Sequence, residues 1–176
     1  MKISNKSAFF FVFLFLLSSG WGVFQFYTKP KTAFILIQEV YSGFDMKKEM
    51  EKKFTQTKNA RQRILDSLGF DLNLLGKKIE AEHEKNKDHI QQFNERKNEY
   101  MERKKNFQED NDQLSKQYDQ EILTQLNQYV KDFGVENGYT YIFGNDGNGS
   151  LMFGKENNNI SKAVTEYINL KYKGAK

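Results

Sequence analysis

The long middle of the chain carries apolar residues at spacings that alternate between three and four. One series runs from Met50 to Ile79 and a second from Ile90 to Phe133. This heptad pattern predicts two long helices that meet along a seam. Several seam positions hold lysine, asparagine or an aromatic residue in place of leucine or isoleucine. We therefore expect a loosely packed helix pair with partly hydrated facing surfaces; an ordinary dry coiled coil is the alternative.

A polar segment separates the two series. Between residues 80 and 89 the only apolar residue is Ala81, and neither Gly nor Pro marks a turn. If the helices form an antiparallel hairpin with arms of equal length, its tip lies near residues 80–90. Gly69 and Gly76 interrupt the first series. Since a glycine costs about 1 kcal/mol relative to alanine inside a helix, we expect irregularity or bending at these two positions.

Shorter elements flank the hairpin. Residues 32–40 form an apolar, β-branched run, which predicts a buried strand, and Asp45 is a candidate cap for the first long helix. Residues 139–143 and 151–153 are aromatic-rich and flank a loop of Gly, Asn and Asp, which predicts a two-stranded hairpin. The stretch 159–172 predicts a final short helix that begins at Asn159 or Ser161.

The expected fold class is therefore α+β. Residues 32–44 and 134–173 would form a small β-rich body. From this body residues 45–133 would project as a long antiparallel helical hairpin, a coiled-coil tentacle.

The loop between the two expected strands matches no known ligand loop. An EF-hand loop needs glycine at its sixth position, and Leu151 stands there when the loop starts at Asp146. A start at Asn145 places Gly147 at a ligand position. A phosphate loop needs Gly-Lys-Ser/Thr before a helix, which the sequence does not provide at Gly154. Turn formation is the remaining interpretation, because Gly and Asn readily adopt positive φ.

The first residues resemble an export signal. Two lysines precede a ten-residue apolar run at residues 8–17, which is the layout of a bacterial signal. Residues 1–28 are then either a signal peptide, cleaved near Gly20, or a signal-anchor in which residues 8–27 span the inner membrane. We favour the anchor because apolar residues continue past Gly20. Both alternatives place the body in the periplasm, either soluble or anchored.

Charge and composition exclude several classes of function. The chain has 27 Lys and Arg against 23 Asp and Glu, but the two kinds balance between residues 45 and 133, so no basic stripe for nucleic acid is expected. The absence of cysteine excludes disulfides and thiolate metal sites. His83 and His89 are six residues apart and do not share a helical face. No catalytic set or cofactor motif stands out, and we expect neither an enzyme nor a bound cofactor or metal.

Three stretches of the sequence resemble the Skp/OmpH family of periplasmic chaperones, in particular its OmpH-like members from Bacteroidetes. These are "TAFILIQEVYSGF", the long charged helices, and the ending "GYTYIFGNDGNGSLMFGKENNNISKAVTEYINLKY". The resemblance covers roughly residues 32–172. In that family an Asp-Ile-Thr motif often opens the last helix, and residues 159–161 (Asn-Ile-Ser) stand in its place.

The resemblance implies a homotrimer whose three hairpins surround a cavity. Family members hold unfolded outer-membrane proteins there without ATP. Scattered aromatic residues on the second helix are then candidate client-binding residues: Phe93, Tyr100, Phe107 and Tyr118. The expected strands are candidate trimer contacts, through Phe34, Ile35, Leu36, Ile37, Tyr141, Ile142 and Phe143. On this hypothesis Ile35→Asp would dissociate the trimer.

Two features depart from the family pattern. The hairpin is neutral, whereas the best-known chaperones of this type have basic tentacles, and the anchor would keep the protein at the inner membrane. The main alternative function is therefore a membrane-anchored coiled-coil structural or adaptor subunit of an envelope assembly, with one fixed partner.

Overall fold

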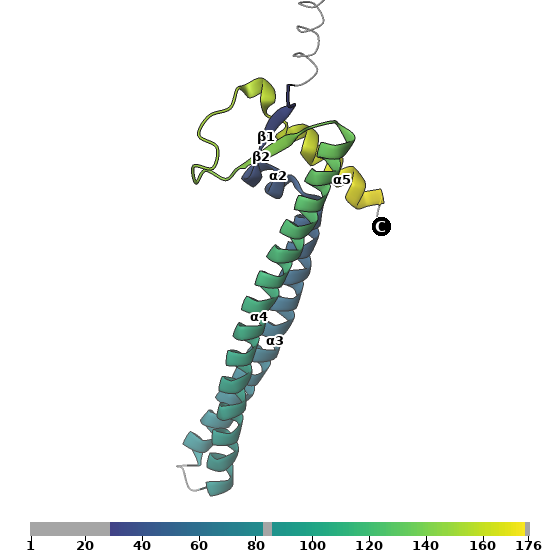
Figure 1. Ribbon diagram of the computed structural model, residues 1–176. Helices are drawn as coiled ribbons and strands as arrows, with labels where there is room; N and C mark the ends of the chain where they lie inside the picture. Colours follow the sequence, from purple (N-terminus) through teal and green to yellow (C-terminus); the bar gives the residue numbers. More distant parts are fainter. Residues whose placement is uncertain (1–28, 83–85, 175–176) are drawn as a thin grey trace, which may run out of the picture.

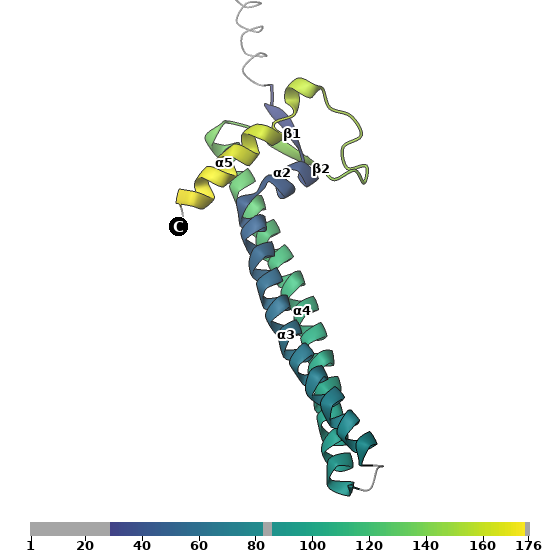
Figure 2. The same ribbon diagram turned by 180° about the vertical axis from the view of Figure 1, so that it is seen from behind.

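The computed structural model describes residues 29–82 and 86–174. In chain order the elements are β1 (Thr32–Leu36), α2 (Ile37–Gly43), α3 (Asp45–Ala81), α4 (Lys87–Glu136), β2 (Tyr141–Asn145), the short 3-10 helix η1 (Glu156–Asn158) and α5 (Ser161–Gly174). The helices α3 and α4 lie side by side and project as a long arm from a small body, which holds all the other elements (Figures 1 and 2).

The long helical hairpin predicted from the heptad pattern is confirmed. The helix α3 ends at Ala81 and α4 begins at Lys87, with the Asn86 side chain accepting hydrogen bonds from the N–H groups of Asp88 and His89. At about 1.5 Å per residue, α3 is roughly 55 Å long. At the tip of the hairpin, His89 Nδ1 lies 2.7 Å from Glu82 Oε2. This contact joins the two helices near their ends.

The body is less β-rich than the sequence indicated. Its sheet has two parallel strands, β1 and β2, with Thr32 opposite Tyr141 and Leu36 opposite Asn145. Two strand predictions are wrong among the described residues. Residues 37–40 belong to α2 and not to β1, and residues 151–153 form no strand. The fold is thus mostly helical with a small sheet.

The hydrophobic core lies where the arm meets the body. It is formed by residues from β1, α2, α4 and α5 and by the junction residue Phe44: Ile35, Val40, Phe44, Ile122, Leu126, Phe133, Val164 and Ile168. Rings of Tyr129 and Tyr172 meet Phe44 edge to face, with centroids 6.2 and 5.6 Å away. Since α4 runs from the tip into this core, the arm and the body share one continuous element.

Phe34 covers the other face of the sheet. Its ring packs so closely on Gly154 that a Cβ there would lie 2.5 Å from the ring. The carbonyl of Phe34 accepts a hydrogen bond from the Ile160 N–H, and the Leu36 N–H donates to Ser161 Oγ. The segment before α5 therefore covers the edge of β1 that β2 does not pair with.

No helix within residues 29–82 and 86–174 has the length and apolarity needed to cross a membrane. The expected anchor or signal at residues 1–28 lies outside the described residues.

Candidate functional site

The four aromatic residues proposed to bind clients all lie along the contact between α4 and α3. A Cβ on Gly76 would lie 3.6 Å from the Phe93 ring, and one on Gly69 would lie 3.8 Å from the Tyr100 ring. Each glycine therefore faces an aromatic ring of α4, at a distance where an added methyl group would make ordinary van der Waals contact. The helix α3 is unbroken through both glycines, so the irregularity expected there does not interrupt it.

Farther up the arm, polar groups occupy the contact. The Arg61 guanidinium donates to Asn111 Oδ1 at 2.5 Å and to Asp110 Oδ2 at 3.1 Å, and it lies 5.7 Å from the Phe107 ring centre. A pocket of about 270 Å³ opens beside these residues. In α3 the only buried residue is Leu65. The arm thus lacks a continuous dry core between its tip and the body.

Tyr118 lies nearer the body, in a pocket of about 220 Å³ with Met50 and Phe54. At the rim of this pocket the Tyr41 hydroxyl donates to Asp119 Oδ1 at 2.7 Å. Burial, together with the hydrogen bond to the Asp119 carboxylate, raises the pKa of Tyr41 to about 12. The bond connects α2 to α4 at the base of the arm.

Phe93, Tyr100, Phe107 and Tyr118 are all half-buried, so much of their surface serves helix packing. The large apolar side chains that the arm exposes are different ones: Ile64, Phe70, Leu74, Met101 and Leu123. The heptad pattern had placed Ile64 in the seam, where the structure does not bury it, and sequence reasoning missed the other four because it followed the seam. Their signal was an apolar residue at a position outside the heptad seam.

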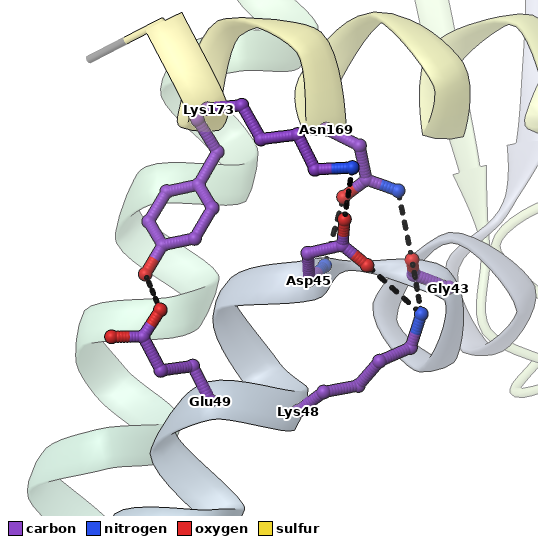
Figure 3. Close-up of polar contacts among 7 residues, drawn as sticks. Gly43, Asp45, Lys48, Glu49, Asn169 and Lys173 are labelled. Carbon is purple, nitrogen blue, oxygen red and sulfur yellow. Dashed lines mark hydrogen bonds and ion pairs between the residues drawn. The ribbon is translucent and has the colours of Figure 1, made fainter. Parts of the chain in front are cut away.

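The start of α3 is held by α5 (Figure 3). The Asp45 N–H, one of the helix N–H groups without an internal partner, donates to Asn169 Oδ1 at 2.8 Å, and Asn169 Nδ2 donates to the Gly43 carbonyl at 3.0 Å. The Tyr172 hydroxyl donates to Glu49 one turn farther along. Asp45 itself was predicted to cap α3, and this is wrong, since the N-cap residue is Phe44 and makes no side-chain cap bond.

Instead, the Asp45 carboxylate forms ion pairs with Lys48 and Lys173, at 3.0 and 3.1 Å. Hydrogen bonds from these two lysines hold the pKa of Asp45 below its ordinary value. A carboxyl with a lowered folded-state pKa stabilises the fold above its unfolded pKa, and this contribution is lost as the pH falls through the folded pKa.

Asn169→Leu is expected to lower the free energy of unfolding by about 1–3 kcal/mol, because it leaves the Asp45 N–H and the Gly43 carbonyl without these partners. Urea unfolding followed by circular dichroism at fixed protein concentration measures the change. Lys173→Ala is the matched control on the same helix, since it removes only an exposed ion pair worth about 0–1 kcal/mol. Equal effects of the two variants would contradict the role given to Asn169.

The residues proposed for trimer contacts divide into two groups. Phe34 and Ile35 are 7% and 4% exposed and pack within one chain, and Ile142 contributes to the same core. Leu36 is half-buried, and Ile37 begins α2. By contrast, Tyr141 and Phe143 are 58% and 47% exposed, with stacked rings 6.0 Å apart. Of this set, these two are the large side chains that are exposed.

The loop after β2 is organised by its own polar side chains. Asn145 Oδ1 accepts from the Gly147 N–H, and Asp146 Oδ1 accepts from the Asn148 N–H. Gly147 and Gly149 adopt positive φ, as the sequence indicated for turn residues. The loop then exposes Met152 and Phe153, at 88% and 81%. Among the described residues, no group of three His, Cys, Asp or Glu side chains could hold a metal ion.

Comparison with known proteins identifies the family. Residues 31–168 match the family model for outer membrane protein (OmpH-like). A crystal structure from Caulobacter crescentus CB15, described as an OmpH-like outer membrane chaperone, matches with a TM-score of 0.70 at 10% sequence identity, over 82% of this chain and 86% of the other. At this identity the structural match shows the fold alone. No curated protein sequence matches the chain. Because the family model covers most of the sequence, the chain belongs to the OmpH-like (Skp) family of outer membrane chaperones, which are not enzymes.

Proposed function

We propose that the protein is an ATP-independent holdase. It binds unfolded outer-membrane or other envelope proteins in a cavity between helical arms and prevents their aggregation. The family membership gives the class of client, and the observation that carries the proposal is the projecting α3–α4 arm. An unfolded barrel protein exposes apolar strands that pair with one another and aggregate. A long arm with single exposed apolar side chains offers such a chain many weak contacts.

The cavity requires several copies, and we propose a homotrimer assembled through the body. Support comes from the sheet, which has two strands among the described residues of one chain. A two-stranded sheet is marginal by itself, and in the described part of the chain one edge of β2 pairs with nothing. Tyr141 and Phe143 project from this strand with much of their surface exposed. An open edge beside exposed aromatic rings suits addition of a neighbouring copy.

We place this activity in the periplasm. The family membership and the export signal expected at residues 1–28 both support this localisation. Cleavage would give a soluble carrier. Anchoring would keep the arms close to the inner membrane, where clients leave the export channel.

Light scattering tests the holdase directly. An outer-membrane β-barrel protein is diluted from urea into buffer with the protein lacking residues 1–28, without ATP. Substoichiometric trimer should suppress the rise in scattering, and added ATP should change nothing. If the protein forms a stable assembly that leaves aggregation unaffected, the holdase proposal is wrong and the adaptor function becomes the better account.

A further inference from the structure

The outer surface of α3 carries a cluster of exposed apolar side chains that helix packing does not explain. Phe70 and Leu74 are 64% and 50% exposed. Phe70 and Leu74 are four residues apart and so lie on the same face. A phenylalanine that is 64% exposed contributes only a small part of its apolar surface to the fold.

The helical phase shows that Phe70 points away from α4. Leu68 and Leu72 lie two residues before and after it and are both half-buried. Two residues correspond to about 200° around a helix, so Phe70 projects from the side opposite these two leucines. Its surface therefore faces away from the contact between the two helices.

Leu74 connects this surface to a groove between the two helices. The groove has a volume of about 340 Å³ and is lined by Asp71, Leu74, Leu75, Lys78, Gln92 and Arg96. Leu74 and Leu75 make its apolar part. Arg96 lies 4.0 Å from Asp71, and Lys78 forms no ion pair with any other described residue, so the polar rim of the groove carries one excess positive charge.

We propose that Phe70 and Leu74 form a client-binding subsite with this groove, named here the α3 subsite. It takes one extended segment of an unfolded protein. An apolar side chain of the segment lies on Phe70 and Leu74, and an acidic side chain beside it lies near Lys78 and Arg96. This inference rests on the proposed holdase function and names residues that carry it, in place of the four aromatic residues between the helices.

The α3 subsite is large enough for an extended segment but too small to hold a folded partner. A large aromatic side chain buries about 150–250 Å², so two side chains supply far less than the roughly 800 Å² that each partner of a stable complex contributes. A single contact of this size is weak and reversible. Copies of the α3 subsite on neighbouring arms would act on the same client chain, and their combined effect gives retention without a tight individual site.

The test measures binding of a fluorescently labelled, urea-unfolded outer-membrane β-barrel protein to the assembled chaperone. Phe70→Gln/Leu74→Gln removes the apolar surface and introduces residues that favour helix. Because full burial of one such side chain contributes about one tenfold step or more in affinity, the double variant should raise the Kd about tenfold or more. Its oligomeric mass and thermal midpoint should equal those of the wild type.

Val135→Gln/Leu170→Gln is the matched control, since both residues are exposed apolar side chains of helices (75% and 72%) but lie at the body and not on the arm. It should change the Kd less than about twofold. A photo-crosslinking residue in place of Phe70 should label the client, and the same residue in place of Leu170 should label it far less. If the wild type binds the client and the Phe70/Leu74 variant binds it equally well, the α3 subsite is wrong while the holdase proposal stands. If the wild type itself does not bind, both fail.

Discussion

Ile35→Asp is expected to unfold the body of the protein. Ile35 is 4% exposed and belongs to the core shared by β1, α2, α4 and α5. The variant removes its apolar contacts, and a buried carboxylate without a partner costs several kcal/mol more. The total approaches the roughly 5–15 kcal/mol that stabilises a typical domain. Circular dichroism should therefore show a cooperative thermal transition in the wild type and none, or one at far lower temperature, in the variant.

Thr32→Asp is the control for this experiment. It introduces the same charge into the same strand at an exposed position, and the thermal midpoint should change little. From the sequence, Ile35→Asp was expected to dissociate the trimer. If the variant does yield a folded single chain with an unchanged midpoint, Ile35 lies at an interface and the core described above is wrong.

Tyr141→Ser/Phe143→Ser is expected to abolish the proposed trimer while leaving each chain folded. Both rings project into solvent from β2, so their loss creates no cavity within the chain. Between copies, the same loss would remove two aromatic contacts for every chain, and aromatic residues dominate the energetics of many interfaces. Sedimentation should give the mass of a single chain, and the helical circular dichroism signal should be retained.

Leu170→Ser serves as the control for the interface. Leu170 is 72% exposed on α5, so the substitution removes a comparable exposed apolar group from another element. This variant should sediment like the wild type. A trimer that survives loss of Tyr141 and Phe143 would place the interface elsewhere on the body.

Long-range periodicity explains why the arm could be predicted from the sequence. The seam positions repeat over many helical turns, so errors at single positions do not change the outcome. The polar segment between the series also lies where the chain reverses. By contrast, the end of β1 could not be predicted, because residues 33–37 are all apolar and both a strand and a helix bury such residues. The turn into α2 begins at Ile37, whose side chain packs on Gly144 of β2.

The details of the body depend on contacts between residues far apart in the chain. The bond from the Asp45 N–H to Asn169 spans 124 residues, so a local reading assigned the cap to Asp45. Similarly, Leu151 to Phe153 have the composition of a strand but do not pair with the adjacent β2, and it is the later segment at Asn159 that joins the sheet, beside β1. Whether an aromatic side chain of α4 points toward α3 or toward solvent depends on the residue that lies opposite it on α3. Only the pairing of the two helices, with Gly69 and Gly76 opposite Tyr100 and Phe93, determines it.

The central claim is that several arms hold one unfolded client between them. Native mass spectrometry of the protein without residues 1–28, mixed with a urea-unfolded outer-membrane β-barrel protein and no ATP, tests it most directly. The account predicts a complex of three chains with one client. A client bound by single chains, or a stable trimer that binds no client, would contradict it.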